Sequence, residues 1–413
     1  MTAPVFVLGG YQSDFARNLA REGTGLDALV GEAVDGALAD AALDAAAIDA
    51  IHVGNAFGEL FTGQAQLGAM PATARPALWG VPAARHEAAC ASGSVALLAA
   101  MAELEAGRAT CALVLGVEQE RNVPGDVAAR HLGAAAWIGH EGEGARFLWP
   151  SMFSAIGDEV ARRWGLDHRH LAAIAGKNLG NARRNPKAQA RGWRYDDDAF
   201  GAGWTDDARN PIVEGRLRRL DCGQLTDGAA AIVVATGEVA RAHVARGGAA
   251  ARVLGWGHRT AGLGLADKLA RSAGEPYLLP HLRAAITDAY RRAGLDGAVG
   301  ARGLDGAEVH DCFSITEYVA IDHLGLTAPG ESWRAIEEGV TAFGGRCPIN
   351  PSGGLIGGGH PVGASGVRMV LDAARQVTGR AGDHQVEGAR RFATLNLGGS
   401  ATTACAFVLG AAA

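Results

Sequence analysis

Two halves of the chain repeat each other, and this duplication constrains the fold more than any other feature of the sequence. Four segments of the first half recur in the same order in the second half. The pairs are residues 7–9 with 253–255, 48–53 with 304–309, 90–94 with 363–367, and 111–118 with 392–399. The offset between partners grows slowly, from 246 to 281 residues. Ordered matches of this kind indicate that one βα unit was duplicated.

A fifth pair of matching segments indicates an insertion in the first half. Residues 230–235 match residues 404–409, but their offset is only 174. The offset thus falls by 107 residues from 281, which gives the size of a segment inserted between about 119 and 226. This segment carries a helical pattern over 151–181 and a polar stretch over 185–210. An insertion of this length is usually a lid or a substrate-binding element.

Each half alternates short apolar segments with Ala- and Leu-rich segments of helical periodicity. The predicted strands include residues 5–8, 50–53, 112–117 and 230–235, and the predicted helices include 26–43 and 92–105. This alternation predicts a layered α/β fold with helices on the faces of the sheets. Two copies of the unit then predict two sheets that enclose helices between them. We expect an N-terminal half over 1–245, with the insertion, and a C-terminal half over 246–413, with a site at their interface.

Composition excludes several classes of protein. The net charge of −6 and the pI of about 6.1 give no basic surface for a nucleic-acid partner. No apolar run reaches the ~18 residues of a membrane span, and the first residues predict a strand rather than a signal peptide. The six cysteines form no CxxC pair and are spread over the chain: Cys90, Cys111, Cys222, Cys312, Cys347 and Cys405. We therefore expect a reducing compartment, a cytoplasmic location, and neither a metal framework nor a disulfide scaffold.

Cys90 is the first candidate catalytic residue. It directly precedes the helix predicted from residue 91 onward. A cysteine at a helix N-terminus lies in a positive field beside free N–H groups, which lowers its pKa and favours the thiolate. The same N–H groups can hold an oxyanion. The competing interpretation is that Cys90 is a small apolar core residue.

His360 ends a second candidate segment, the glycine-rich stretch 350–361. Five of the seven residues over 353–359 are glycine. Glycine allows a close approach, so the backbone there must pass very close to a neighbouring group. The duplication places His360 near the start of the second-half helix, as Cys90 lies near the start of its first-half counterpart. His360 is therefore a candidate base for Cys90. A phosphate-binding loop or a simple turn is the alternative for a stretch of this kind.

Polar residues also follow two predicted strands in the second half. His310, Asp311 and Cys312 end one strand, and titratable groups in such a place are costly unless they serve a purpose. Cys312 is a candidate proton donor if its pKa lies near neutrality. The segment 396–400 ends the other strand, and its glycine amides are candidate donors to an oxyanion.

These motifs together resemble the thiolase superfamily, and most closely its sterol-carrier-protein-thiolase branch. The segments that carry the resemblance are Cys90-Ala91-Ser92-Gly93-Ser94, His310-Asp311-Cys312-Phe313, Gly359-His360-Pro361 with Gly363-Ala364-Ser365-Gly366, and residues 396–400. Further segments across nearly the whole chain follow the order of that branch. The resemblance implies a duplicated five-layered α/β/α/β/α fold with a loop domain inserted in the first half. It also implies an acyltransferase of lipid metabolism.

The resemblance also implies a role for each site residue. Cys90 would attack a 3-ketoacyl-CoA after activation by His360, and the amides of Cys90 and Gly398 would hold the oxyanion. His360, assisted by His310, would hold the thioester oxygen of the enolate. Two positions depart from the better-known thiolase pattern, because His310 replaces an asparagine and Asn396 replaces the second catalytic cysteine. In the sterol-carrier-protein branch that second role belongs to the cysteine at Cys312.

The same resemblance sets expectations for ligands and partners. Coenzyme A thioesters would be substrates, with no resident cofactor and no metal. The chain would form a homodimer or tetramer, and members of this branch can assemble with a small OB-fold, zinc-containing protein. Three alternatives stay open: an acyltransferase with a non-CoA acceptor, a retro-aldol lyase, and a non-enzymatic partner subunit. Retention of Cys90, Cys312 and His360 disfavours the last two.

Overall fold

A computed structural model describes residues 3–295 and 300–412 of the chain. Among these residues, nine strands form one large sheet in the order β3-β2-β4-β7-β1-β8-β11-β10-β9. Their bounds are β1 Val5–Gln12, β2 Ala50–Gly54, β3 Ala83–His86, β4 Cys111–Glu118, β7 Gly228–Thr236, β8 Ala251–Thr260, β9 Gly306–Val309, β10 Arg391–Gly398 and β11 Thr403–Ala411. A separate hairpin pairs β5 (Ile212–Glu214) with β6 (Leu217–Arg218).

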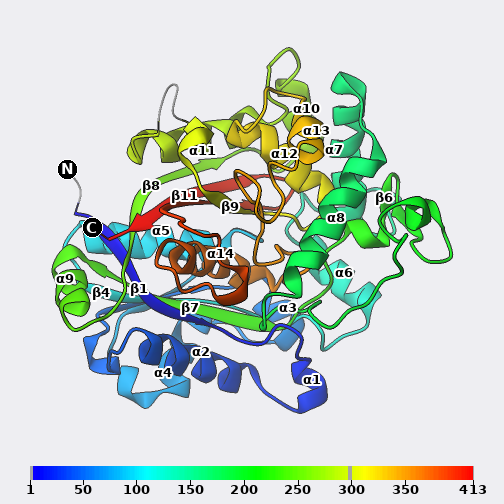
Figure 1. Cartoon of the computed structure of the whole chain (residues 1–413). Helices are drawn as coiled ribbons and strands as arrows, with labels where there is room; N and C mark the ends of the chain where they lie inside the picture. Colours follow the sequence, from blue (N-terminus) through cyan, green and yellow to red (C-terminus); the bar gives the residue numbers. More distant parts are fainter. Residues whose placement is uncertain (1–2, 296–299, 413) are drawn as a thin grey trace.

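The strand order is symmetrical about its centre, as the duplication predicts. β1, β7, β4 and β2 of the first half take the places that β8, β11, β10 and β9 take in the second. The two halves meet through a short antiparallel ladder in which Phe6 pairs with Arg252 and Val7 with Ala251. From this join the two half-sheets spread apart to enclose helices (Figure 1). The boundaries 1–245 and 246–413 stay a prediction.

The helices form three layers around the two half-sheets. α5 (Ser92–Glu105) and α14 (Val362–Val377) lie between the half-sheets (Figure 1). α2 (Leu26–Asp40) covers the outer face of the first half-sheet, and α11 (Pro280–Arg292) covers that of the second. The other helices are α1 Leu19–Glu22, α3 Gly58–Thr62, α4 Met70–Ala74, α6 Gly125–Gly133, α7 Leu148–Trp164, α8 His168–Ala182, α9 Gly237–Ala245, α10 Leu265–Arg271, α12 Ser314–Leu324 and α13 Ser332–Glu337. The predicted five-layered α/β/α/β/α fold is confirmed.

Glycines let the two central helices cross at their first turns. A Cβ on Gly93 would lie 2.7 Å from the carbonyl oxygen of Gly363, and a Cβ on Gly366 would lie 2.6 Å from the nitrogen of Ser94. Any larger residue at these positions would push the helices apart. The close crossing brings together the segments that precede α5 and α14, which carry Cys90 and His360.

Two predicted helices differ from the structure in extent. The helix predicted over 26–43 ends at Asp40, because Ala42 adopts a left-handed conformation with φ of 48° and reverses the chain. The continuous helical pattern over 151–181 is two helices, α7 and α8. The break follows Gly165, whose φ is +80°, and α8 begins after Asp167, whose side chain accepts from the amide of Arg169.

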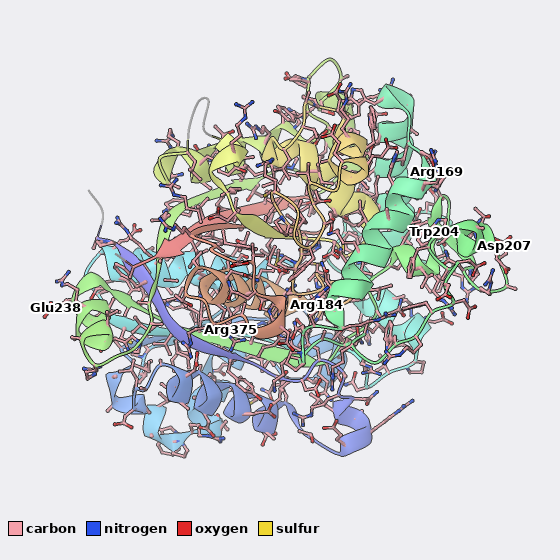
Figure 2. The ribbon with its side chains drawn as sticks, in the orientation of Figure 1. Arg169, Arg184, Trp204, Asp207, Glu238 and Arg375 are labelled. Carbon is pink, nitrogen blue, oxygen red and sulfur yellow. The ribbon has the colours of Figure 1, made fainter. Side chains whose placement is uncertain are left out.

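The insertion lies beside the two half-sheets. α6, α7 and α8 and the β5–β6 hairpin all belong to it. Figure 2 shows Arg169 on α8, with Trp204 and Asp207 on the outer side of the insertion. No helix of the described residues is long and apolar enough to cross a membrane.

Candidate active site

Cys90 lies in a tight turn between β3 and α5. Ala89 adopts a left-handed conformation with φ of 50°, and the amide of Ala91 donates to the carbonyl of Ala88. A left-handed conformation is strained for a residue with a side chain. The turn presents Cys90 just ahead of α5, whose N-cap is Ala91. The predicted position at a helix start therefore agrees with the structure to within one residue.

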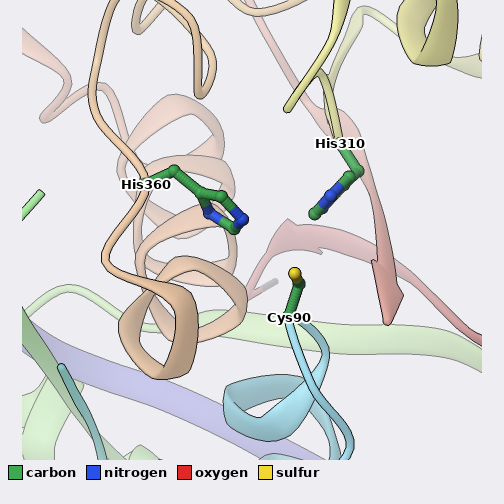
Figure 3. A group of neighbouring side chains, drawn as sticks. All are labelled: Cys90, His310 and His360. Carbon is green, nitrogen blue, oxygen red and sulfur yellow. The ribbon is translucent and has the colours of Figure 1, made fainter. Parts of the chain in front are cut away.

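The structure brings Cys90 together with both predicted histidines. One ligand atom each of Cys90, His310 and His360 lies within 4.8 Å of the others, and Figure 3 shows the three side chains converging. The two imidazole rings are edge to face, with centroids 5.2 Å apart. These residues come from three segments that are far apart in the sequence. Such a group could also hold a metal ion, so the expectation of no metal stays a prediction.

Ser365 fixes the position of the proton on His360. The hydroxyl of Ser365 donates to the carbonyl of Pro361 at 2.9 Å. Its oxygen lies 2.7 Å from Nδ1 of His360 and therefore accepts from an Nδ1–H group. In the neutral ring, Nε2 then carries a lone pair. Nε2 is buried and has no hydrogen-bond partner among the described residues. His360 is thus arranged as a base.

Asn396 and Ser94 fix the opposite tautomer on His310. The hydroxyl of Ser94 donates to Oδ1 of Asn396 at 2.8 Å, so the Asn396 amide group faces His310. Its Nδ2 lies 3.1 Å from Nδ1 of His310, which must accept. The proton of neutral His310 therefore lies on Nε2. His310 is arranged as a hydrogen-bond donor, complementary to the base at His360.

Burial keeps all three groups neutral. It lowers the pKa of His360 to about 3, with Arg368 adding to the effect, and it lowers the pKa of His310 well below its ordinary value. It also raises the pKa of the Cys90 thiol to about 12. The sequence-based expectation of a lowered cysteine pKa is therefore wrong. The helix start favours the thiolate, but the cost of placing a charge in a poorly solvated site is the larger effect here.

Cys312 lines the same cavity as Cys90 and His360. It is 9% exposed, and its sulfur lies 3.9 Å from the hydroxyl oxygen of Thr316. Burial raises its pKa well above the ordinary value, and the nearby Cys90 raises it further. Cys312 thus holds its proton at rest. This raised pKa differs from the pKa near neutrality on which the predicted role of Cys312 as proton donor depended.

A neighbouring glycine provides the backbone donor beside Cys90. The amides of Gly399 and of Cys90 itself favour the thiolate and oppose the rise in the pKa of the Cys90 thiol. The sequence indicated Gly398, one residue earlier. Gly398 ends β10 and passes so close to the loop before Cys90 that a Cβ there would lie 2.1 Å from the carbonyl oxygen of Ala88. The role of Gly398 as a donor stays a prediction.

Asp311 anchors the glycine-rich loop, a function that its place in the sequence did not reveal. Its carboxylate accepts from the amide of Leu355 at 2.6 Å and from Nδ2 of Asn178 at 2.7 Å. Burial raises its pKa to about 7. Asn178 lies on α8 of the insertion. Asp311 therefore links three segments: the end of β9, the glycine-rich loop and α8.

A cavity of about 400 Å³ opens over the site, and its walls are mostly apolar. Most of the lining comes from the insertion, including Leu132, Phe147, Leu148, Trp149, Phe153 and Leu225. Glu120 also faces the cavity, although it is only 1% exposed. Burial and the neighbouring Glu118 raise its pKa well above the ordinary value. No motif pointed to Glu120, although a carboxylate two residues past the end of the apolar strand β4 was a usable signal.

Two models of the same protein family match successive parts of the chain. The family described as "Thiolase, N-terminal domain" matches residues 5–238, and "Thiolase C-terminal domain-like" matches residues 267–411. The acetyl-CoA acetyltransferase of Methanothermobacter thermautotrophicus is 31% identical over 381 residues, 92% of this chain and 93% of that protein. Sterol carrier protein 2 of Homo sapiens is 29% identical over 410 residues, 95% of this chain and 70% of that protein.

Solved structures show the same fold. The "Ltp2-ChsH2(DUF35) aldolase" matches with a TM-score of 0.75 and 22% identity over 99% of this chain and 98% of the other. An acetyl-CoA acetyltransferase from Syntrophomonas wolfei matches with a TM-score of 0.69 and 18% identity over 99% of both chains. Fold, site and relatives together define an enzyme of the acyltransferase class. The chain belongs to the thiolase family, as the sequence motifs predicted.

Proposed function

We propose that the chain is a thiolase-type acyl-CoA C-acyltransferase that works through an acyl group on Cys90. It would cleave 3-ketoacyl-CoA with coenzyme A, or condense two acyl-CoA units in the reverse direction. One observation carries the proposal: Cys90 meets two neutral histidines of opposite tautomer beneath an apolar cavity. A base and a donor on either side of one thiol suit acyl transfer, which needs both.

The first half-reaction forms the acyl-enzyme. Nε2 of His360 takes the proton of Cys90 as the sulfur attacks the keto carbon, and the amides of Cys90 and Gly399, with the predicted Gly398, hold the oxyanion. The C2–C3 bond then breaks and leaves an enolate, whose oxygen accepts from Nε2–H of His310 and from His360, now protonated. Cys312 gives its proton to the enolate carbon, which releases acetyl-CoA (or propionyl-CoA) and leaves the shortened acyl group on Cys90.

The second half-reaction restores the site. Coenzyme A gives its thiol proton to the Cys312 thiolate and attacks the acyl carbon on Cys90. Cys90 leaves as the thiolate and recovers its proton from His360. The charges that form are thus transient, in agreement with a resting site in which burial keeps every group neutral.

One structural likeness favours a second candidate, a retro-aldol lyase with a small partner protein. The solved aldolase that shares this fold is named as a complex with a DUF35 protein. A lyase of that kind does not need the nucleophile Cys90. The small OB-fold, zinc-containing partner is proposed on the same ground.

We also propose a homodimer or tetramer. β3 is an edge strand that pairs only with β2 among the described strands, and its first residues, Ala83 and Ala84, are exposed. Trp79, close before it in the chain, is 73% exposed. An exposed edge beside an exposed aromatic side chain is suited to pairing with a second copy. A cytoplasmic location and a role in lipid metabolism stay predictions.

The decisive experiment is a thiolysis assay over a series of 3-ketoacyl-CoA chain lengths, with the wild type and Cys90→Ala. We expect activity in the wild type alone and labelling of Cys90 by iodoacetamide that acetyl-CoA blocks. Equal activity in both proteins would refute the proposal. Cleavage of a 3-hydroxyacyl-CoA by both proteins would support the lyase instead.

A further inference from the structure

We propose that Lys268 is a positioning residue that holds the turn 399–402 and, through it, the Gly399 amide at the Cys90 sulfur. The proposal rests on the proposed function, because that function gives the Gly399 amide its role at the oxyanion. Lys268 lies on α10, and no sequence motif pointed to it.

All three protons of the Lys268 ammonium group are used. Nζ donates to Oγ of Ser400 at 2.7 Å, to Oγ1 of Thr402 at 2.8 Å and to the carbonyl of Leu263 at 2.9 Å. Two of these acceptors are side chains of the turn. The third holds Nζ to the segment just before α10. Lys268 therefore clamps the turn against a separate part of the chain.

Lys268 is an unusual residue to bury. It is 5% exposed, and among the described residues its Nζ contacts neutral oxygens and no carboxylate. Its surroundings include Glu141, which attracts it from a distance, and His281 on α11. Burial of a lysine without a close carboxylate is costly, and lysines are almost never buried without a partner. The cost implies a specific purpose at this place.

The turn that Lys268 holds has a strained backbone. Gly399 has a φ of 61° and Ala401 a φ of 56°. A left-handed conformation is unfavourable for alanine, so the surrounding structure must impose it. Contacts from outside the turn help to impose it. Lys268 holds two of its side chains, Nε2 of His281 donates to the carbonyl of Ala401 at 2.7 Å, and the amide of Ala261 donates to the carbonyl of Thr402 at 2.7 Å.

The strained turn 399–402 lies beside Cys90, the proposed nucleophile. Gly399 begins the turn and lines the same cavity as Cys90. Its amide opposes the rise in the pKa of the Cys90 thiol. An oxyanion donor is effective only when it is held in place, and a displacement of about 1 Å can cost roughly 100-fold in rate. Loss of the clamp would let the turn relax and the amide move away from the sulfur.

The test compares Lys268→Met with the wild type in two assays. The first is kcat and KM for thiolysis. The second is the rate of Cys90 alkylation by iodoacetamide, which needs no coenzyme A substrate. Lys187→Met is the matched control, because Lys187 is a partly buried lysine whose Nζ lies over the ring of Tyr11 and not at the turn. Ser400→Ala with Thr402→Val removes the two side-chain acceptors and leaves the lysine.

We expect Lys268→Met to lower kcat about 10- to 100-fold with little change in KM and to slow alkylation of Cys90. Lys187→Met should match the wild type. The Ser400→Ala/Thr402→Val variant should show the same defect, and combining it with Lys268→Met should add little. Wild-type kcat in a folded Lys268→Met protein would overturn the proposal, as would additive effects in the combined variant. If the wild type lacked thiolysis altogether, the proposed function would fail, while alkylation would still test the clamp.

Discussion

Removal of the Ser365 hydroxyl tests the tautomer on which the proposed mechanism depends. In Ser365→Ala, Nδ1–H of His360 loses the acceptor at 2.7 Å, in a ring that is partly buried and whose Nε2 atom is fully buried. A buried donor left without a partner costs about 1–3 kcal/mol. That cost falls on the tautomer with the lone pair on Nε2, so the ring shifts toward the form that cannot take the Cys90 proton. The base is then present in a smaller fraction of molecules.

The expected loss follows from this free energy. At 1.36 kcal/mol per factor of ten, 1–3 kcal/mol corresponds to about a 5- to 150-fold fall in the rate of Cys90 acylation. The assay is the burst of free coenzyme A released when the enzyme is mixed with an acyl-CoA. Ser365→Thr is the control, since it keeps the hydroxyl and should retain most of the rate.

A double-mutant cycle separates this effect from a general disturbance of α14. In the background of His360→Asn, which has no imidazole to orient, Ser365→Ala should change the remaining rate little. An acylation rate within twofold of the wild type in Ser365→Ala would refute the assigned tautomer. A full additional loss in the His360→Asn background would show that Ser365 acts through the helix and not through the histidine.

Three further outcomes are expected. Cys312→Ser should nearly abolish condensation yet leave Cys90 acylation measurable, and loss of acylation itself would contradict the role given to Cys312. Because burial lowers the pKa of His360 to about 3 from an ordinary value near 6.5, the base stays neutral and active as the pH falls, so the acylation rate should show no acid limb near pH 6.5. Arg368→Met should lower the free energy of unfolding in urea by about 3–5 kcal/mol, because Glu308 and Asp372, each 2.9 Å from Arg368, lose a buried cation. Adding Glu308→Gln should restore part of that loss, and an unchanged midpoint in Arg368→Met would contradict the reasoning.

The sequence predicted the fold well because duplication is a long-range signal. The matched segments 111–118 and 392–399 correspond to β4 and β10, which take equivalent places in the strand order. The same signal put Cys90 and His360 at the starts of two equivalent helices, and the structure brings them together. The helical pattern over 151–181 did not reveal the break between α7 and α8, because periodicity alone does not locate a break that depends on the backbone of Gly165.

The electrostatics of the site could not be predicted in the same way. The predicted Cys90 thiolate depended only on neighbours in the sequence. The neutral state depends on burial, to which segments from the whole chain contribute. The tautomers depend on Ser365 for His360 and on Asn396 and Ser94 for His310, and Ser94 lies 302 residues from Asn396 in the sequence. Each of these serines looks like an ordinary helix residue until the fold is known.

A neutral resting site also explains why two opposite tautomers are needed. If Cys90 were already a thiolate, a single charged histidine could serve it. Burial makes that ion pair costly, so the thiol must lose its proton only as the substrate carbonyl arrives. At that moment, negative charge moves from the sulfur to an oxygen, and donors must already point at it. In the proposed mechanism, Nε2 of His360 accepts the proton and the amides of Cys90 and Gly399 hold this first oxyanion. Nε2–H of His310 donates to the enolate oxygen that forms next. The strained turn at 399–402 and the buried Lys268 are then parts of the same arrangement, because a site without permanent charges depends on donors that are held in place before the reaction begins.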